Sequence, residues 1–298
     1  MVAFIDEHRE AYRVEPICEV LPIAPSTYFT HRARADDPSL RPTRVVRDEG
    51  LRAEVRRVWA ESDSVYGAQK VWKQLLREKV AVARCTVERL MRDLGLRGVT
   101  RGRAYKVTTV ADERATHPPN LVQRHFRASR PSQLWVADIT YVATWVGLAY
   151  VAFVTDVFSR RIVGWRVSSS LRSGLAFDAL KQALYFCPDA RGVVHHRGTQ
   201  YTSIRYTERL LEAGVERSVG SVGDSYDNAL AESINALFKA ELIHRKGPWR
   251  SIEAVEHGVM RWVDWFNNRR LLEPLGYVPP VEFEQLYYRQ QMSPVMVA

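Results

Sequence analysis

Residues 134–168 read LWVADITYVATWVGLAYVAFVTDVFSRRIVGWRVS, and this segment sets the architecture of the 298-residue chain. Its β-branched and aromatic residues form three runs, which short turns at residues 145–147 and 159–160 separate. The pattern predicts three antiparallel strands in a meander. Helical spacing and short β-branched runs alternate between residues 173 and 243, so the sequence predicts an α/β sheet with helices on its faces.

A second informative segment is residues 223–243, GDSYDNALAESINALFKAELI. Acidic and hydroxyl side chains at its start can cap a helix, and apolar residues then recur at helical spacing. Glu232 lies off this apolar stripe. Asn228, Asn235 and Lys239 share the polar face of Glu232. Such a face is either a solvated surface with a weak ion pair or part of a functional site.

Asp138 places a carboxylate inside the first predicted strand. An ionised acid in a core strand is costly unless it is paired or bound to a metal. Asp156, at the end of the second strand, is expected to cap a turn. Asp138 and Glu232 would meet if the helix packs beside the first strand. Two converging carboxylates suit Mg²⁺ or Mn²⁺, which prefer oxygen ligands, and in a DNA-binding protein they indicate metal-assisted phosphoryl transfer.

The chain is basic, with a net charge of +9 and an isoelectric point near 9.6, which indicates a polyanionic partner. Residues 1–130 hold 25 Lys and Arg against 17 Asp and Glu, whereas residues 131–298 hold 18 against 17. The N-terminal half is therefore expected to grip phosphates. Three widely spaced cysteines form neither a disulfide framework nor a zinc site, and no apolar run approaches the roughly 20 residues of a membrane span. We expect a cytoplasmic protein.

Apolar residues recur at helical spacing within residues 51–96 and predict three short helices. The last helix carries Arg84, Arg89 and Arg92 as exposed side chains, which suits a helix-turn-helix DNA reader. A plain three-helix bundle with arginines for solubility is the alternative. The basic segment that follows favours DNA binding.

The sequence divides into five consecutive regions. A short helical segment with a charged linker precedes the helix-turn-helix domain. A basic linker, with Arg101 and Arg103 as expected DNA contacts, then leads to the α/β core. A C-terminal helix and a Pro-rich extension follow, and we expect the extension to wrap over the core with Trp265 and Tyr277 as anchors. The expected bounds are 1–47, 48–100, 101–130, 131–246 and 247–298.

Five motifs carry a resemblance to a known family. They are WVADITYV (135–142), FVTDVFSRRIVGW (153–165), HHRGTQYTS (195–203), GDSYDNALAES (223–233) and WFNNRRLLEPLGYVPPVEF (265–283). Together they resemble the OrfB-type transposases of bacterial insertion sequences, which are similar to retroviral integrases. The resemblance implies a ribonuclease H-like mixed sheet flanked by helices and preceded by an all-α helix-turn-helix domain.

The resemblance also implies how such a protein works. The expected activity is end cleavage and strand transfer on DNA, with a site for two Mg²⁺ or Mn²⁺ ions. The expected partners are the element ends, the target DNA and further copies of the chain, in a nucleoid-associated setting. Fusion to the product of an upstream reading frame by ribosomal frameshifting is common in this family.

The family's catalytic residues are Asp, Asp and Glu, and the motifs match Asp138 to the first Asp and Glu232 to the Glu. Lys239 matches a basic residue that lies along the DNA end. The family pattern has a small hydroxyl residue and then the second Asp between the His-His pair and Arg-Gly. Both residues are missing here, since His196 is followed directly by Arg197. The family places 35 residues between the second Asp and the Glu, and residues 197–231 span that length.

This departure leaves three interpretations open. The first is a transposase of impaired activity. The second is an inactive DNA-binding remnant or repressor of transposition. The third, a nuclease of the same fold, needs the same missing carboxylate and is the weakest. The two histidines before the gap are expected to have structural roles, since imidazole matches Mg²⁺ poorly.

Overall fold

The computed structural model describes residues 1–100, 128–171, 173–187, 190–197, 204–219 and 229–292. Five strands form one mixed sheet in the order β3-β2-β1-β4-β5. The three long strands form the expected antiparallel meander, and the two short strands lie parallel to β1. The strands are β1 (Leu134–Thr144), β2 (Gly147–Asp156), β3 (Ile162–Ser168), β4 (Val194–Arg197) and β5 (Glu216–Val219).

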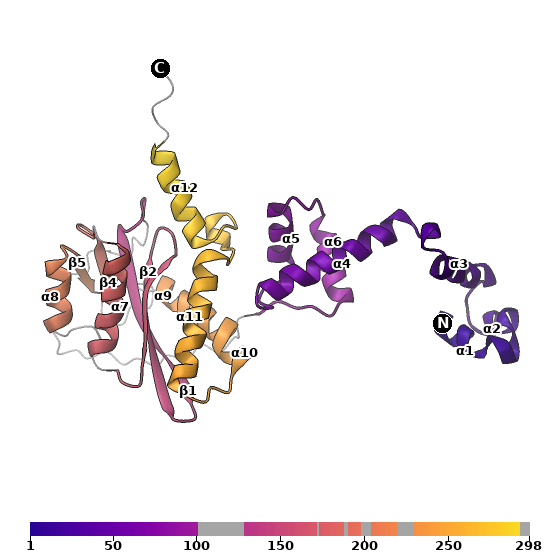
Figure 1. Ribbon diagram of the computed structural model, residues 1–298, viewed down its shortest axis with the longest axis horizontal. Coiled ribbons are helices and arrows are strands. Elements are labelled where there is room, and N and C mark those ends of the chain that lie inside the picture. Colours follow the sequence, from indigo (N-terminus) through magenta and orange to yellow (C-terminus); the bar gives the residue numbers. More distant parts are fainter. Residues whose placement is uncertain (101–127, 172, 188–189, 198–203, 220–228, 293–298) are drawn as a thin grey trace, which may run out of the picture.

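Helices cover both faces of the sheet (Figure 1). On one face lie α7 (Ser173–Phe186) and α8 (Ile204–Glu212). On the other lie α9 (Ala229–Phe238), which continues through the π-helical turn Lys239–Ile243 into α10 (His244–Lys246), and α11 (Ile252–Asn268). The expected N-cap residues of the segment 223–243, like Asn228, lie outside the described residues.

Alternation along β2 builds the two hydrophobic layers, because successive side chains point to opposite faces of a strand. Ala152 and Val154 pack with α7, whereas Val151 and Phe153 pack with α9 and α11. Gly164 of β3 is needed for the close approach of α7, since a Cβ there would lie 2.1 Å from the carbonyl oxygen of Ala179. The alternation that predicted the strands also explains their burial.

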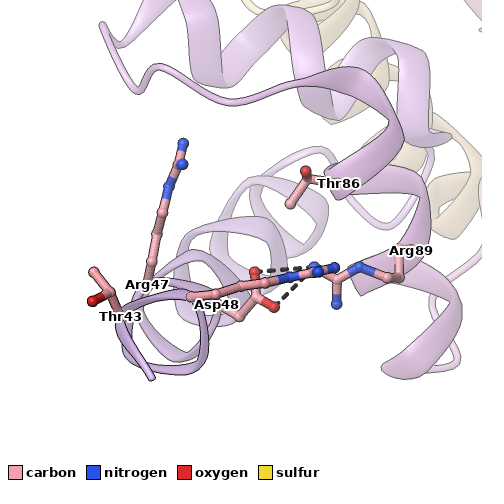
Figure 2. Close-up of a pocket in the computed structure, with 6 residues that line it drawn as sticks. Thr43, Arg47, Asp48, Thr86 and Arg89 are labelled. Carbon is pink, nitrogen blue, oxygen red and sulfur yellow. Dashed lines mark hydrogen bonds and ion pairs between the residues drawn. The ribbon is translucent and has the colours of Figure 1, made fainter. Parts of the chain in front are cut away.

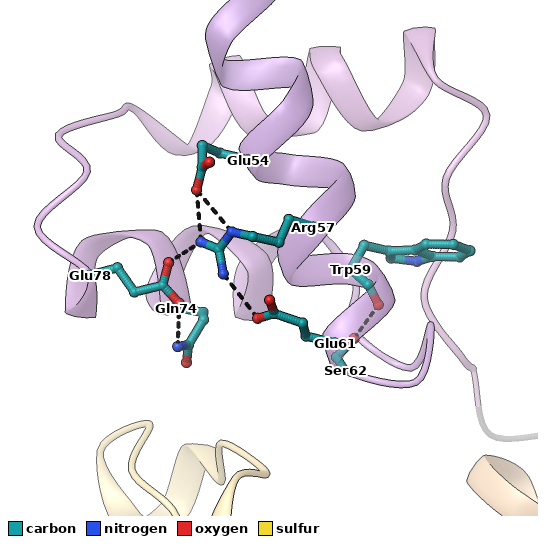
Figure 3. A network of polar contacts seen from close by, with 7 residues as sticks. All are labelled: Glu54, Arg57, Trp59, Glu61, Ser62, Gln74 and Glu78. Atoms are coloured by element: carbon teal, nitrogen blue, oxygen red, sulfur yellow. Dashed lines mark hydrogen bonds and ion pairs between the residues drawn. The ribbon is translucent and has the colours of Figure 1, made fainter.

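The bundle of three helices predicted before the sheet is present as α4 (Thr43–Glu61), α5 (Ala68–Arg77) and α6 (Arg84–Asp93). Their apolar faces share a core. Figure 3 shows a polar network on this bundle, in which Arg57 binds Glu54, Glu61 and Glu78. The Arg57 guanidinium thus connects the C-terminal part of α4 to the end of α5.

The charged linker expected in the later part of region 1–47, at residues 31–47, is mostly helical in the structure and is not an irregular connection. α3 (Pro25–Asp36) reaches into it from one side, and α4 begins within it at Thr43. The N-terminal segment also contains α1 (Val2–Tyr12), α2 (Val14–Val20) and a 3₁₀ turn (Pro38–Leu40). α1–α3 share a small core of their own, in which Ile5 and Tyr28 are almost fully buried.

The C-terminal extension joins the bundle to the sheet. Its 3₁₀ turn (Glu273–Leu275) leads to α12 (Pro280–Met292), a helix that the Pro-rich sequence did not predict. Tyr277 accepts a hydrogen bond from Gln69 of α5 at 3.3 Å, so this expected anchor faces the N-terminal bundle. α12 also contacts the β2–β3 turn, where Glu284 pairs with Arg161 at 3.1 Å.

A second junction forms around the tyrosine that precedes α5. The Tyr66 hydroxyl donates to the carbonyl oxygen of Arg269 at 3.1 Å and accepts from the backbone N–H of Leu271 at 2.7 Å. Its ring lies 6.1 Å from that of Trp265, the other expected anchor.

Within the described residues, no helix has both the length and the apolar character that a membrane crossing needs.

Candidate active site

The polar face of α9 meets the acid of β1. Asn235 donates from Nδ2 to Oδ2 of Asp138 at 2.8 Å, and the backbone N–H of Ile139 donates to Oδ1 at 2.9 Å. One turn earlier on α9, Ala231 packs against Val136. The alternation of β1 puts Val136 and Asp138 on the same face, so the helix lies along this face of the strand.

Three charged groups act on one another here. Burial raises the pKa of the Asp138 carboxyl to about 6, and the negative charge of Glu232 adds to the rise. The hydrogen bonds that Asp138 accepts and the positive charge of Lys239 act in the opposite direction. Glu232 itself is exposed. The structure thus brings together an enclosed carboxylate, an accessible one and a cation.

Asn235 is a member of this site that sequence reasoning did not include among the candidate residues. Its Oδ1 atom is buried and has no hydrogen-bond partner among the described residues. The signal was present in the sequence, because Asn235 follows Glu232 by three positions on the same helical face. Its partner on a strand 97 positions away could not be inferred from that spacing.

A divalent cation would find oxygen donors in this cluster. Asp138 and Glu232 offer carboxylates, and Asn235 offers the unpartnered amide oxygen. Mg²⁺ and Mn²⁺ favour this kind of donor set. Within the described residues, however, no group of three or more His, Cys, Asp and Glu side chains is placed to hold a metal ion.

The third corner of the expected triad falls at the end of β4. This strand runs parallel to β1, with Arg197 beside Ala137. The next residue on β1 is Asp138, and the next residue after β4 is Gly198, which lies outside the described residues. No Asp or Glu occurs in the sequence from residue 190 to residue 207.

The two histidines of β4 are packed inside the sheet layers. His195 forms a hydrogen bond between Nε2 and the Tyr206 hydroxyl at 2.6 Å, and His196 one between Nδ1 and Ser218 Oγ at 3.0 Å. Both side chains are buried. Asp156 caps the β2–β3 turn, as predicted, because its Oδ2 accepts from the N–H and the hydroxyl of Ser159 at 2.8 and 2.6 Å.

Comparison with known proteins connects this geometry to a family. Residues 128–225 and 213–280 match models described as integrase core domains, and residues 46–104 match an HTH-like domain. The transposase for insertion sequence element IS629 of Shigella sonnei is 53% identical over 290 residues, covering 97% of each chain. The chain belongs to the insertion-sequence transposases with an integrase core domain.

One further relative agrees with this assignment. A Mycobacterium tuberculosis protein named for the insertion sequence element IS986/IS6110 is 55% identical over 281 residues, covering 92% of this chain and 99% of that protein. Among solved structures, the HTLV-2 integrase catalytic core domain in complex with magnesium is 14% identical, with a TM-score of 0.43. The matched region covers 53% of this chain and 99% of the HTLV-2 integrase chain.

Three arginines of α6, in the HTH-like domain, are expected to bind DNA, and their surroundings differ. Arg84 and Arg92 are exposed. Arg89 is not, and the expectation that it is exposed is wrong, because its Nη2 donates to both carboxylate oxygens of Asp48 at 3.0 and 2.8 Å. Arg101 and Arg103 lie outside the described residues.

A basic hollow of about 410 Å³ lies between α4 and α6 (Figure 2). Its lining is rich in arginine and includes one acid; the residues are Thr43, Arg44, Arg47, Asp48, Thr86 and Arg89. Arg47 donates to the carbonyl oxygen of Ala81 at 3.0 Å, and Arg89 is held by Asp48. Sequence reasoning missed Arg44 and Arg47, because it treated their segment as a linker.

Proposed function

We propose that this chain acts on DNA as a transposase by metal-dependent phosphoryl transfer, with Asp138 and Glu232 as its metal-binding carboxylates. The observation that carries the proposal is the position of Asp138, which is bonded to Asn235 of α9 and within electrostatic reach of Glu232. The family assignment supplies the reaction class.

Each side chain has a definite task in this proposal. Asp138 is ionised above pH 6, and the Asn235 amide fixes the direction of its carboxylate. Glu232, being exposed, faces an incoming DNA end, and Lys239 offers its ammonium to a nearby phosphate. A bound divalent ion would supply charge stabilisation for the attacking and leaving oxygens. Water attacks first and the freed 3′-OH second, so no covalent protein–DNA intermediate forms.

This copy is proposed to have little strand-transfer activity, because its sequence lacks the second Asp that the family resemblance places directly after His195 and His196. The strand that would carry it, β4, ends with His196 and Arg197, and Gly198 follows. Loss of a residue that merely orients a metal ligand typically costs about 10–100-fold. Loss of a ligand itself should cost at least as much.

A second candidate function also follows from the missing Asp. A chain with a folded HTH-like domain and an incomplete acid cluster could bind the element ends without cutting them. Such a protein would repress transposition or persist as an inactive remnant. The net charge of +9 and the basic hollow between α4 and α6 support DNA binding in either case.

The chain is further proposed to form homo-oligomers. The HTLV-2 integrase core domain is described in trimeric and dimeric forms, and a transposase must hold two element ends at once. Fusion to an upstream frame product remains a prediction from the family resemblance.

Titration with Mn²⁺, followed by electron paramagnetic resonance, tests the metal site directly. We expect the full chain to bind at most one ion weakly, and Asp138→Asn to abolish that binding. Two tightly bound ions would contradict the proposed impairment. Equal binding by the natural chain and Asp138→Asn would contradict the assignment of the site.

A further inference from the structure

Two exposed aromatic rings, each faced by a cation, follow Asp138 in the chain: Tyr141 lies on β1 and Trp145 in the turn directly after it. Tyr141 is 49% exposed and Trp145 66% exposed. The Lys239 ammonium lies 4.9 Å from the centroid of the Tyr141 ring, and the Arg250 guanidinium lies 5.3 Å from that of Trp145. We call Tyr141, Trp145, Lys239 and Arg250 the ring–cation strip.

The strip follows an edge of β1 that the described part of β4 leaves open. The pairing of β1 with β4 is described as far as Ala137. At the other end of the strand, the backbone N–H of Trp145 donates to the carbonyl oxygen of Trp249 at 3.0 Å, and Thr144 bridges to the same residue. The chain from α9 to Trp249 therefore runs beside β1 in the same direction as the strand.

This parallel course explains why the cations meet the rings. Asn235 contacts Asp138, Lys239 contacts Tyr141, and the residue before Arg250 pairs with the end of β1. A strand rises about 3.3 Å per residue, so Tyr141 lies about 10 Å and Trp145 about 23 Å along β1 from Asp138.

The chemistry of the strip favours nucleic acid over protein as its partner. Tyr, Trp and Arg are common at protein interfaces as well, but Lys is depleted there, whereas a phosphate backbone can be bound by both cations of the strip. Grooves that bind single-stranded nucleic acid combine positive charge along the backbone with aromatic rings on which bases stack. Val146 and Leu148 are exposed nearby. Because they are apolar, the rival occupant of this surface is a second copy of the chain.

We propose that the ring–cation strip binds an unpaired strand of DNA at the edge of β1, next to the Asp138 site. The bases stack on Tyr141 and Trp145, while Lys239 and Arg250 leave the ring faces and pair with phosphates. The inference depends on the proposed function for its DNA partner, but it requires no catalysis by this copy.

Fluorescence anisotropy with two labelled DNAs tests the strip in buffer containing EDTA. One DNA is a blunt duplex, and the other carries a single-stranded extension of about six nucleotides. We expect the variant Tyr141→Ala/Trp145→Ala to bind the extended duplex at least about tenfold more weakly and the blunt duplex unchanged. Tyr141→Phe/Trp145→Phe keeps the rings and should retain the natural affinity.

The control is Tyr185→Ala, which removes an 80% exposed ring that lies on α7 and is not part of the strip. It should bind both DNAs as the natural chain does. Equal affinity of the natural chain for the two DNAs, or an equal loss for both in the alanine variant, would overturn the strip. The proposal would also be overturned if the alanine variant sedimented as a monomer where the natural chain is an oligomer, and still preferred the extended DNA. Failure to bind either DNA would contradict the proposed function itself.

Discussion

Asn235 donates a hydrogen bond of 2.8 Å to Asp138 and so joins the polar face of α9 to the middle of β1. This bond fixes one carboxylate oxygen, while the backbone N–H of Ile139 holds the other at 2.9 Å. The fold itself therefore orients the Asp138 carboxylate.

Asn235→Ala should lower the affinity for Mn²⁺ by about 10–100-fold, since it removes a group that orients a proposed metal ligand. The measurement is Mn²⁺ binding by electron paramagnetic resonance. Asn268→Ala, which changes an exposed amide at the end of α11, serves as the control and should bind like the natural chain. An unchanged affinity in Asn235→Ala would show that this bond has no part in metal binding.

Asp138→Asn should stabilise the metal-free chain at pH 8. The pKa of Asp138 is about 6 in the folded chain against an ordinary value of 3.8. Between these values the folded state binds more protons than the unfolded state, so the free energy of unfolding falls as pH rises, by up to about 3 kcal/mol. The difference in melting temperature between Asp138→Asn and the natural chain should therefore shrink toward pH 4.

Thermal unfolding in EDTA between pH 4 and pH 8 checks this expectation. The exposed acid of α11 provides a control, and Asp264→Asn should show no such dependence on pH. A melting temperature of Asp138→Asn that lies below that of the natural chain at pH 8 would be inconsistent with the raised pKa.

Glu241→Gln should lower the free energy of unfolding by about 3–5 kcal/mol. Glu241 is buried in the π-helical turn after α9 and pairs with Arg270, whose Nε lies 3.0 and 3.1 Å from its two oxygens. The substitution leaves the buried guanidinium without a charged partner. Urea denaturation is the measurement, and Glu212→Gln, in an exposed pair on α8, should change stability by less than about 1 kcal/mol. Comparable losses in both variants would contradict the account of the buried pair.

Arg44→Ala/Arg47→Ala should weaken DNA binding and lower the salt dependence of the binding constant by about one unit for each phosphate that an arginine no longer neutralises. Both arginines line the basic hollow between α4 and α6. The control Arg209→Ala removes an exposed arginine of α8 and should leave the salt dependence unchanged. Arg89→Ala should also lower stability, because it breaks the bond to Asp48. An identical salt dependence in the natural chain and the double variant would remove the hollow from the DNA-binding surface.

The sheet and most helices could be predicted from the sequence because their signals are local. Alternating β-branched residues and short turns defined β1–β3, and helical spacing defined α4–α7 and α11. Two segments that contain prolines were predicted incorrectly. They were interpreted as irregular chain before α4 and before α12, yet Pro42 directly precedes the first residue of α4 and Pro280 is the first residue of α12, a position that suits proline.

The acid pair was predicted as far as pattern allows. Helical spacing placed Glu232, Asn235 and Lys239 on one face, but only the packing of α9 on β1 joins that face to Asp138. Arg89 shows the same limit, because its partner Asp48 lies 41 positions away on another helix. Side-chain pairs that depend on tertiary contacts leave no periodic signal in a single sequence.

The most direct test of the account is a strand-transfer assay on a DNA end in Mg²⁺ or Mn²⁺, comparing the natural chain with a variant that has Ser-Asp inserted between His196 and Arg197. We predict activity at least about 100-fold higher in the insertion variant, lost again when Asp138→Asn is added to it. Efficient strand transfer by the natural chain, or by the insertion variant carrying Asp138→Asn, would contradict the account.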